Sequence, residues 1–141
     1  MRIAGINGVS CVNGDGVRFV LFTQGCAHHC KGCQNSDTWD FQGGYEMSVE
    51  EIAEKYRTHS KMLDGITLSG GDPFYQQQEC CRLLDLLPGV NVWIYTGFLY
   101  EEICGTELAR RADVIVDGQY VEAKRCEGQL YGSSNQRIIR K

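Results

Sequence analysis

Short apolar segments alternate with amphipathic ones along most of this chain. Four segments of three to six residues are rich in β-branched and aromatic side chains, and they predict strands at residues 17–22, 66–69, 90–95 and 114–116. Because these runs are almost continuously apolar, we expect a parallel sheet that is covered on at least one face.

Three amphipathic segments lie between or beside the predicted strands. The first helix is expected to begin after Ser48, which has capping-box spacing with Glu51. The second is expected after Asp72, an N-cap residue followed by proline, and it ends before Pro88. The third covers about residues 100–111, acidic at its start and basic at its end, as the helix dipole favours.

This alternation of strands and helices predicts right-handed βαβ units. Each unit takes ~30 residues, so the 141 residues form a single domain, residues 1–141, and a closed eight-stranded barrel of ~250 residues is excluded. We therefore predict the α/β class, with an open sheet or a partial α/β barrel of about four to six strands. In both architectures, ligands bind at the carboxyl ends of the strands.

Eight cysteines change this picture most. Their share of the chain is below the ~8–10% of a disulfide scaffold. The first residues lack the apolar segment of a signal peptide, and no run of ~20 apolar residues predicts a membrane span. We therefore expect a cytoplasmic protein without a membrane partner, whose thiols serve ligation or redox chemistry.

The charge of the chain adds less. A net charge of −4 argues against a broad nucleic-acid surface. Residues 118–141 carry five basic and two acidic side chains, so this segment is +3 and the remainder is −7. Such a segment is most often solvated surface, and docking or contact with an anion is the alternative.

Three of the cysteines follow the first predicted strand with the spacing C-x3-C-x2-C: Cys26, Cys30 and Cys33. Thiols this close on a loop can converge on one centre. A structural zinc site needs four ligands, so a loop histidine or Cys11 would have to supply the fourth. A cubane iron–sulfur cluster typically has four thiolates, and three would leave one iron open for a ligand. The spacing favours the cluster and leaves zinc as an alternative.

This cysteine loop, followed by Ser69-Gly70-Gly71-Asp72 at the end of the next strand, resembles the radical S-adenosylmethionine superfamily. The resemblance implies a 4Fe-4S cluster on the three cysteines, with S-adenosylmethionine chelated to the open iron. It also implies that the glycine–glycine–acid segment binds the amino group of the methionine moiety, a role compatible with Asp72 as a helix N-cap.

Within this superfamily, further segments resemble the activating proteins of the anaerobic ribonucleoside-triphosphate reductase. They occur in order at residues 12–18, 32–39, 68–73, 93–97, 116–118 and 132–137, and the last, GSSNQR, is the most family-specific. The superfamily usually has an aromatic residue before the third cysteine, where Gly32 stands here. This departure implies that Gly32, Cys33 and Gln34 contact the adenine through their backbone.

The resemblance extends to residues at the ends of the last two predicted strands. Related activases imply that Thr96 and Asp117 help to hold the methionine carboxylate, directly or through a monovalent cation. For Asp117 the alternative is a turn residue before Gly118. The last polar segment contains Ser133, Ser134, Asn135 and Arg137. The resemblance implies that these residues close over the ribose or face the partner, and the alternative is a surface loop.

The activity implied by the resemblance is that of an oxidoreductase. The reduced cluster passes one electron to S-adenosylmethionine, and the resulting 5′-deoxyadenosyl radical removes a Cα hydrogen from a glycine of the anaerobic ribonucleoside-triphosphate reductase. The implied partners are that reductase and a one-electron donor such as flavodoxin or ferredoxin. Because the cofactor supplies the chemistry, no further catalytic side chain is required. The alternatives are an activase of another glycyl-radical enzyme, a radical enzyme for a small molecule, and a zinc-binding interaction module.

Overall fold

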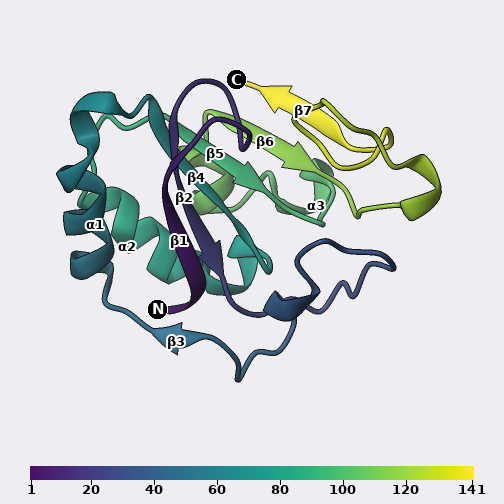
Figure 1. Ribbon diagram of the computed structural model, residues 1–141, viewed down its shortest axis with the longest axis horizontal. Helices are drawn as coiled ribbons and strands as arrows, with labels where there is room; N and C mark the ends of the chain where they lie inside the picture. The colour runs from purple at the N-terminus through teal and green to yellow at the C-terminus, as the bar shows by residue number, and fades with distance from the viewer.

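One seven-stranded sheet organises the protein in a computed structural model that describes residues 1–141. The strands are β1 (Arg2–Ser10), β2 (Arg18–Thr23), β3 (Tyr45–Glu46), β4 (Gly65–Gly70), β5 (Val92–Tyr95), β6 (Val114–Asp117) and β7 (Arg137–Arg140). Their order is β3-β1-β2-β4-β5-β6-β7, and the sheet is not closed (Figure 1). The predicted α/β class and open sheet are confirmed.

The four predicted strands are the parallel centre of this sheet, β2, β4, β5 and β6. The predicted total of four to six strands was too low, because β1, β3 and β7 add antiparallel to the edges. β1 contains two glycines and alternates only weakly, and β3 has two residues. These three strands, which flank the parallel centre, lack the apolar runs by which the central strands were recognised.

The helices are α1 (Val49–Thr58), α2 (Gln77–Asp85), α3 (Tyr100–Ile103) and α4 (Glu107–Arg111). The predicted cap of α1 is present, since the Ser48 hydroxyl accepts from the Glu51 N–H at 3.1 Å. The single helix predicted at 100–111 is wrong: Thr106 begins a new helix by accepting from the Ala109 N–H at 3.2 Å. No helix is long and apolar enough to cross a membrane.

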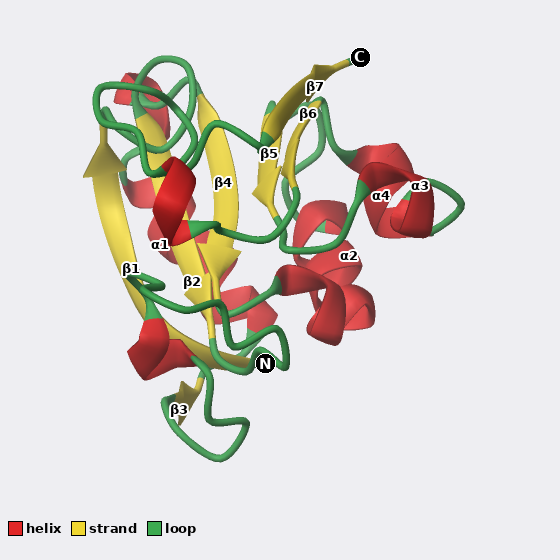
Figure 2. Cartoon of the chain, turned by 90° about the vertical axis from the view of Figure 1, so that its right-hand side faces the viewer, coloured by secondary structure: helices red, strands yellow, loops and turns green.

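The two faces of the sheet differ in chemistry. Alternate strand residues such as Leu68, Ile94 and Ile115 point to the helices and belong to a cluster of 23 buried apolar residues. Figure 2 shows α2, α3 and α4 together on one side of β4, β5 and β6. On the other face, Trp93 and Val116 belong to a cluster of only three buried apolar residues. This second face, which no helix covers, is free to hold a ligand.

A buried arginine occupies that second face near the amino ends of the parallel strands. Arg18 is 1% exposed, and its five N–H groups meet uncharged acceptors. They are the Thr67 hydroxyl, the side-chain and backbone oxygens of Asn91, and the carbonyls of Ile66 and Asp15, at 2.8–3.2 Å. The amino end is therefore filled, which leaves the carboxyl end for a cavity.

Candidate functional site

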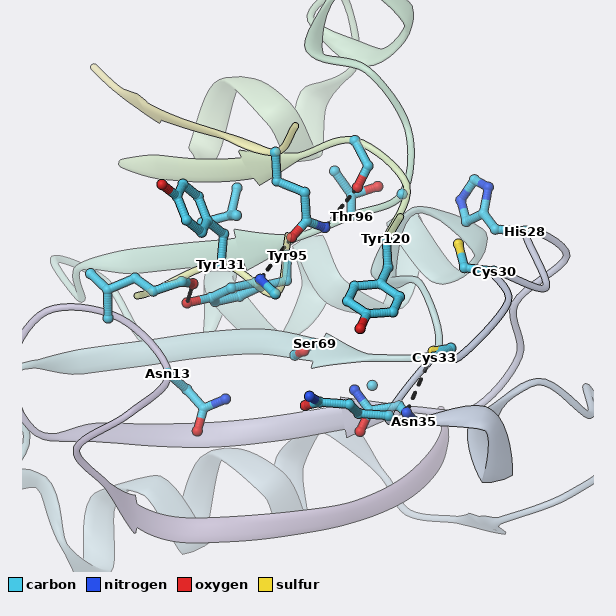
Figure 3. A pocket seen from close by; sticks show the side chains of 18 of the residues that line it. Asn13, His28, Cys30, Cys33, Asn35, Ser69, Tyr95, Thr96, Tyr120 and Tyr131 are labelled. Carbon is cyan, nitrogen blue, oxygen red and sulfur yellow. Dashed lines mark hydrogen bonds between the residues drawn. The ribbon is translucent and has the colours of Figure 1, made fainter. Parts of the chain in front are cut away.

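A cavity of about 410 Å³ lies at the carboxyl ends of the parallel strands, on the face without helices (Figure 3). Two segments border it: residues 24–35, here called the cysteine loop, and residues 118–136, here called the strap. The predicted site residues that line it are Cys26, Cys30, Cys33, Gln34, Ser69, Gly70, Gly71 and Thr96. Gly32, Asp72 and Asp117 do not line it. The structure thus brings most of the predicted residues to one cavity.

The two glycines at the end of β4 bring the cysteine loop against the sheet. A Cβ on Gly71 would lie 2.4 Å from the Gly25 carbonyl oxygen, and one on Gly70 would lie 2.4 Å from the Thr23 nitrogen. The same carbonyl of Gly25 accepts from the Asp72 N–H at 3.0 Å. The close approach that these glycines allow is therefore between two parts of the chain itself.

The three sulfurs of the cysteine loop lie beside backbone N–H groups. Cys33 Sγ accepts from the Asn35 N–H at 3.4 Å. Burial raises the pKa of Cys30 and Cys26, and nearby N–H groups oppose this by favouring the thiolates, that of Tyr120 in the case of Cys30. N–H donors to sulfur are one way in which proteins tune iron–sulfur clusters. The environment of these three cysteines suits metal-bound thiolates.

Three cysteines outside the cysteine loop contact backbone carbonyls. Sγ donates to a backbone carbonyl in Cys80 (3.7 Å), Cys104 (3.8 Å) and Cys126 (3.4 Å). Burial raises the pKa of Cys80 far above its ordinary value, and Cys80 belongs to the buried apolar cluster, as a small apolar residue would. Cys126 also lines the cavity, which the sequence did not indicate.

A single metal ion does not suit this arrangement. No three His, Cys, Asp or Glu side chains are grouped closely enough to hold one ion. Among the candidates for a fourth zinc ligand, His28 bonds to Asp72, the His29 ring stacks on Trp39 with ring centroids 4.6 Å apart, and Cys11 is exposed. In a cubane cluster, each thiolate binds a different iron, so the sulfurs stand further apart than the ligands of one ion. The three cysteines fit a cluster.

The carboxylate of Asp72 is buried and accepts hydrogen bonds from the chain itself. Its side chain is 0% exposed. It accepts from the Phe74 N–H (3.1 Å), the Thr96 hydroxyl (2.8 and 3.0 Å), the Gly97 N–H (2.9 Å) and His28 Nε2 (2.8 Å). Asp72 therefore caps the short 3-10 helix Pro73–Gln76, and α2 begins only after it, at Gln77. Contact with a methionine amino group stays a prediction.

Asp117 and Thr96 also form hydrogen bonds with side chains of this chain, Asp117 with Arg137 and Thr96 with Asp72. Asp117 is buried and accepts from Arg137 Nε at 3.0 Å and from the Tyr100 N–H at 2.7 Å. Arg137 also donates to both carboxylate oxygens of Glu101, at 2.9 and 2.8 Å, and lowers the pKa of Glu101 to about 2. The sequence showed no sign of this ion-pair group. A carboxylate or cation contact of Thr96 or Asp117 stays a prediction.

Side chains within the segment GSSNQR hold the strap in place. Gln136 Oε1 accepts from the N–H groups of Gly132 (2.8 Å) and Ser133 (3.1 Å), and its Nε2 donates to the first carbonyl of the strap (2.9 Å). The Tyr95 hydroxyl donates to the Leu130 carbonyl at 2.6 Å. These contacts give the segment a structural role, while contact with a ribose or a partner stays a prediction.

Gly32 lies where the strap meets the cysteine loop. Its φ is +76°, and a Cβ there would lie 2.9 Å from Glu122 Cδ. The exposed Glu122 side chain can move away, so the positive φ is the stronger reason for glycine at this position. Its adenine contact stays a prediction.

Aromatic and amide side chains that the sequence did not single out complete the wall. Figure 3 shows Tyr95, Tyr120, Tyr131 and Asn13 around the cavity. For Tyr95, a signal was present, because its neighbour Ile94 is a core residue and adjacent strand residues point to opposite faces. The strap residues carried no such signal, since their placement depends on the fold of a loop.

Comparisons with known proteins agree with this geometry. A family model described as a 4Fe-4S single cluster domain matches residues 12–139. The anaerobic ribonucleoside-triphosphate reductase-activating protein of Enterobacteria phage T4 is 37% identical over 134 residues, which cover 90% of this chain and 86% of that protein. The proteins of the same name from Vibrio cholerae and Escherichia coli K12 are 35% and 32% identical, and the matches cover 94% and 91% of this chain and 93% and 91% of theirs.

Proposed function

Because this chain belongs to the family of anaerobic ribonucleoside-triphosphate reductase-activating proteins, we propose that it generates a glycyl radical on that reductase. It is a radical S-adenosylmethionine enzyme, and its cofactors are a 4Fe-4S cluster and S-adenosylmethionine. The reductase is its protein substrate. Binding of this cluster and of S-adenosylmethionine explains why a chain of 141 residues carries three thiols in one loop beside a cavity.

The observation that carries the proposal is the environment of the cysteine loop. Cys26, Cys30 and Cys33 line one cavity, and backbone N–H groups lie beside their sulfurs. When bound, the cluster and S-adenosylmethionine supply reductive cleavage of the sulfonium and hydrogen-atom abstraction. The chain contributes three cysteine ligands and a fixed loop.

The rest of the cavity orients the cofactor and limits its access to water. Gln34, Ser69 and the two glycines at the end of β4 form the wall nearest the cysteines. Tyr120 and Tyr131 of the strap line the cavity as well (Figure 3). Backbone contacts to the adenine at residues 32–34, and an ammonium contact at residues 69–72, are part of the proposal.

The finer classification belongs to the proposal too. We assign residues 1–141 to one radical S-adenosylmethionine domain and regard the open sheet as its partial barrel. A monovalent cation at Thr96 and Asp117, a flavodoxin or ferredoxin as electron donor, and a cytoplasmic setting complete the assignment. The cytoplasmic setting rests on eight cysteines that are all free thiols.

Anaerobic reconstitution with iron and sulfide tests the chemistry. We expect a brown protein with about four irons per chain that cleaves S-adenosylmethionine when it is reduced. Cys26→Ala should lose both the colour and the cleavage, whereas Cys126→Ala should keep both, because Cys126 lies outside the C-x3-C-x2-C segment. A colourless protein that binds one zinc per chain would refute the proposal and favour an interaction module.

A second measurement tests the protein substrate. The loaded protein, mixed with the anaerobic reductase and S-adenosylmethionine under reducing conditions, should produce a glycyl radical visible by electron paramagnetic resonance. Replacing the radical-bearing glycine of the reductase by alanine should abolish the signal. If cleavage proceeds and no radical forms on the reductase, another glycyl-radical enzyme becomes the better substrate.

A further inference from the structure

His28 lies in the cysteine loop, midway between Cys26 and Cys30, and its side chain is only 9% exposed. Its Nε2 atom lies 2.8 Å from Asp72 Oδ2. The ring also packs edge-on against Phe98, with ring centroids 4.6 Å apart. A single side chain of the cysteine loop therefore contacts the segments that follow both β4 and β5.

Each ring nitrogen of His28 has a polar neighbour. A carboxylate that is ionised can only accept, so Nε2 carries a hydrogen and donates it to Asp72. On the other side, the amide nitrogen of Gln119, a strap residue, lies 3.4 Å from Nδ1. This contact places the strap beside the second ring nitrogen. His28 thus joins the cysteine loop to both the sheet and the strap.

The backbone after β5 is shaped to accept this ring. A Cβ on Gly97 would lie 2.5 Å from His28 Cδ2 and 2.9 Å from its Nε2. The N–H of the same glycine donates to Asp72 Oδ2 at 2.9 Å. Gly97 therefore leaves room for the imidazole, and both groups share one carboxylate oxygen. This fit does not depend on the hydrogen bonds of the ring.

We propose that His28 is a positioning residue that fixes Cys26 and Cys30 relative to the ends of β4 and β5, and that Asp72 acts through it. The inference rests on the proposed function, because it concerns the residues that would hold the cluster. Loss of the bond frees the loop without removing a ligand. Iron uptake should therefore survive, while the stability and electronic properties of the bound cluster should change.

Three variants separate this role from simple packing. His28→Phe keeps a ring against Phe98 and removes both nitrogens, and His28→Gln restores a donor near the position of Nε2. Gly97→Ala displaces the ring without altering it. The matched control is His29→Asn in the same loop, because the His29 side chain stacks on Trp39 and has no bond to Asp72.

The measurements are iron content, the rate of iron release to a chelator, and the electron paramagnetic resonance spectrum of the reduced cluster. We expect His28→Phe and Gly97→Ala to load iron, to release it about tenfold faster than the unmodified protein, and to give an altered spectrum. Replacing residues that support metal ligands commonly weakens metal binding by this factor. His28→Gln should return both readouts towards those of the unmodified protein, and His29→Asn should leave them unchanged.

The inference is overturned if His28→Phe matches the unmodified protein in release rate and spectrum, or if His28→Gln is as impaired as His28→Phe. Circular dichroism of the cluster-free variants checks that they fold. Failure of the unmodified protein to bind about four irons would instead refute the proposed function. The two failures are therefore distinguishable in one set of samples.

Discussion

The cysteine loop and the strap border the same cavity, but different groups hold them. The cysteine loop rests on the sheet through backbone contacts, such as the Asp72 N–H to the Gly25 carbonyl at 3.0 Å, and through glycines that allow close approach. The strap is held by side chains, above all those of Gln136 and Tyr95. The cysteine loop thus has backbone contacts with the sheet in addition to the side-chain bond of His28, whereas the contacts of Gln136 and Tyr95 with the strap are made by side chains alone.

Gly71→Ala should have the largest effect, because it breaks the backbone packing under the cysteine loop. The added methyl group would lie 2.4 Å from the Gly25 carbonyl oxygen, so the loop has to move. We expect a loss of about 3 kcal/mol in the free energy of unfolding and loss of most iron binding. Urea denaturation of the cluster-free protein and iron analysis measure these effects.

Gly105→Ala is the matched control, since a Cβ there would meet nothing within 4 Å. It should keep full iron binding and unfold at an unchanged or slightly higher urea concentration. Equal losses in both variants would contradict the distinction between the two glycines.

Gln136→Ala should have an intermediate effect that is confined to the strap. It removes three hydrogen bonds, each worth about 1 kcal/mol, and frees the N–H groups of Gly132 and Ser133. We expect faster hydrogen exchange and faster proteolysis within residues 118–136, with iron content unchanged. Gln78→Ala, at an exposed position of α2, is the control. Loss of iron in Gln136→Ala would show that the strap also supports the cysteine loop.

Glu101→Gln should have the smallest effect, because Glu101 is an exposed residue of α3 that pairs with the half-exposed Arg137 of β7. Arg137 lowers the pKa of Glu101 from 4.5 to about 2, so ionised Glu101 stabilises the folded protein above pH 4.5. This contribution is lost as the pH falls towards 2. The unmodified protein should therefore exceed the variant slightly in unfolding midpoint at neutral pH, and the two should converge between pH 4.5 and 2. A difference that is independent of pH would exclude this cause.

The central part of the fold could be predicted from the sequence because each element had a local signal. The parallel strands are continuous apolar runs, and Ser48 marks the start of α1. The edge strands could not be recognised, since β7 depends on pairing with β6 and on Arg137 meeting Asp117. The division of the third helix was missed because Thr106 had cap chemistry inside an otherwise helical pattern.

The candidate site follows the same division. The three cysteines were recognisable from their spacing alone, and the structure places all three on one cavity. The bond between His28 and Asp72 joins residues 44 positions apart. Such a contact exists only after β2 and β4 pair, so no local pattern announces it. Tyr120 and Tyr131 reach the cavity through a loop that is held by Gln136. Such a loop follows no periodic pattern of apolar and polar residues, so its shape could not be predicted from the sequence.

The buried guanidinium of Arg18 limits how this part of the chain can evolve. All five of its N–H groups have uncharged acceptors, and two of these acceptors are oxygens of Asn91. Lysine offers three donors on a flexible stem and would leave acceptors unmatched. We therefore expect Arg18, Thr67 and Asn91 to covary in evolution, because a replacement at one of these positions requires a compensating replacement at another.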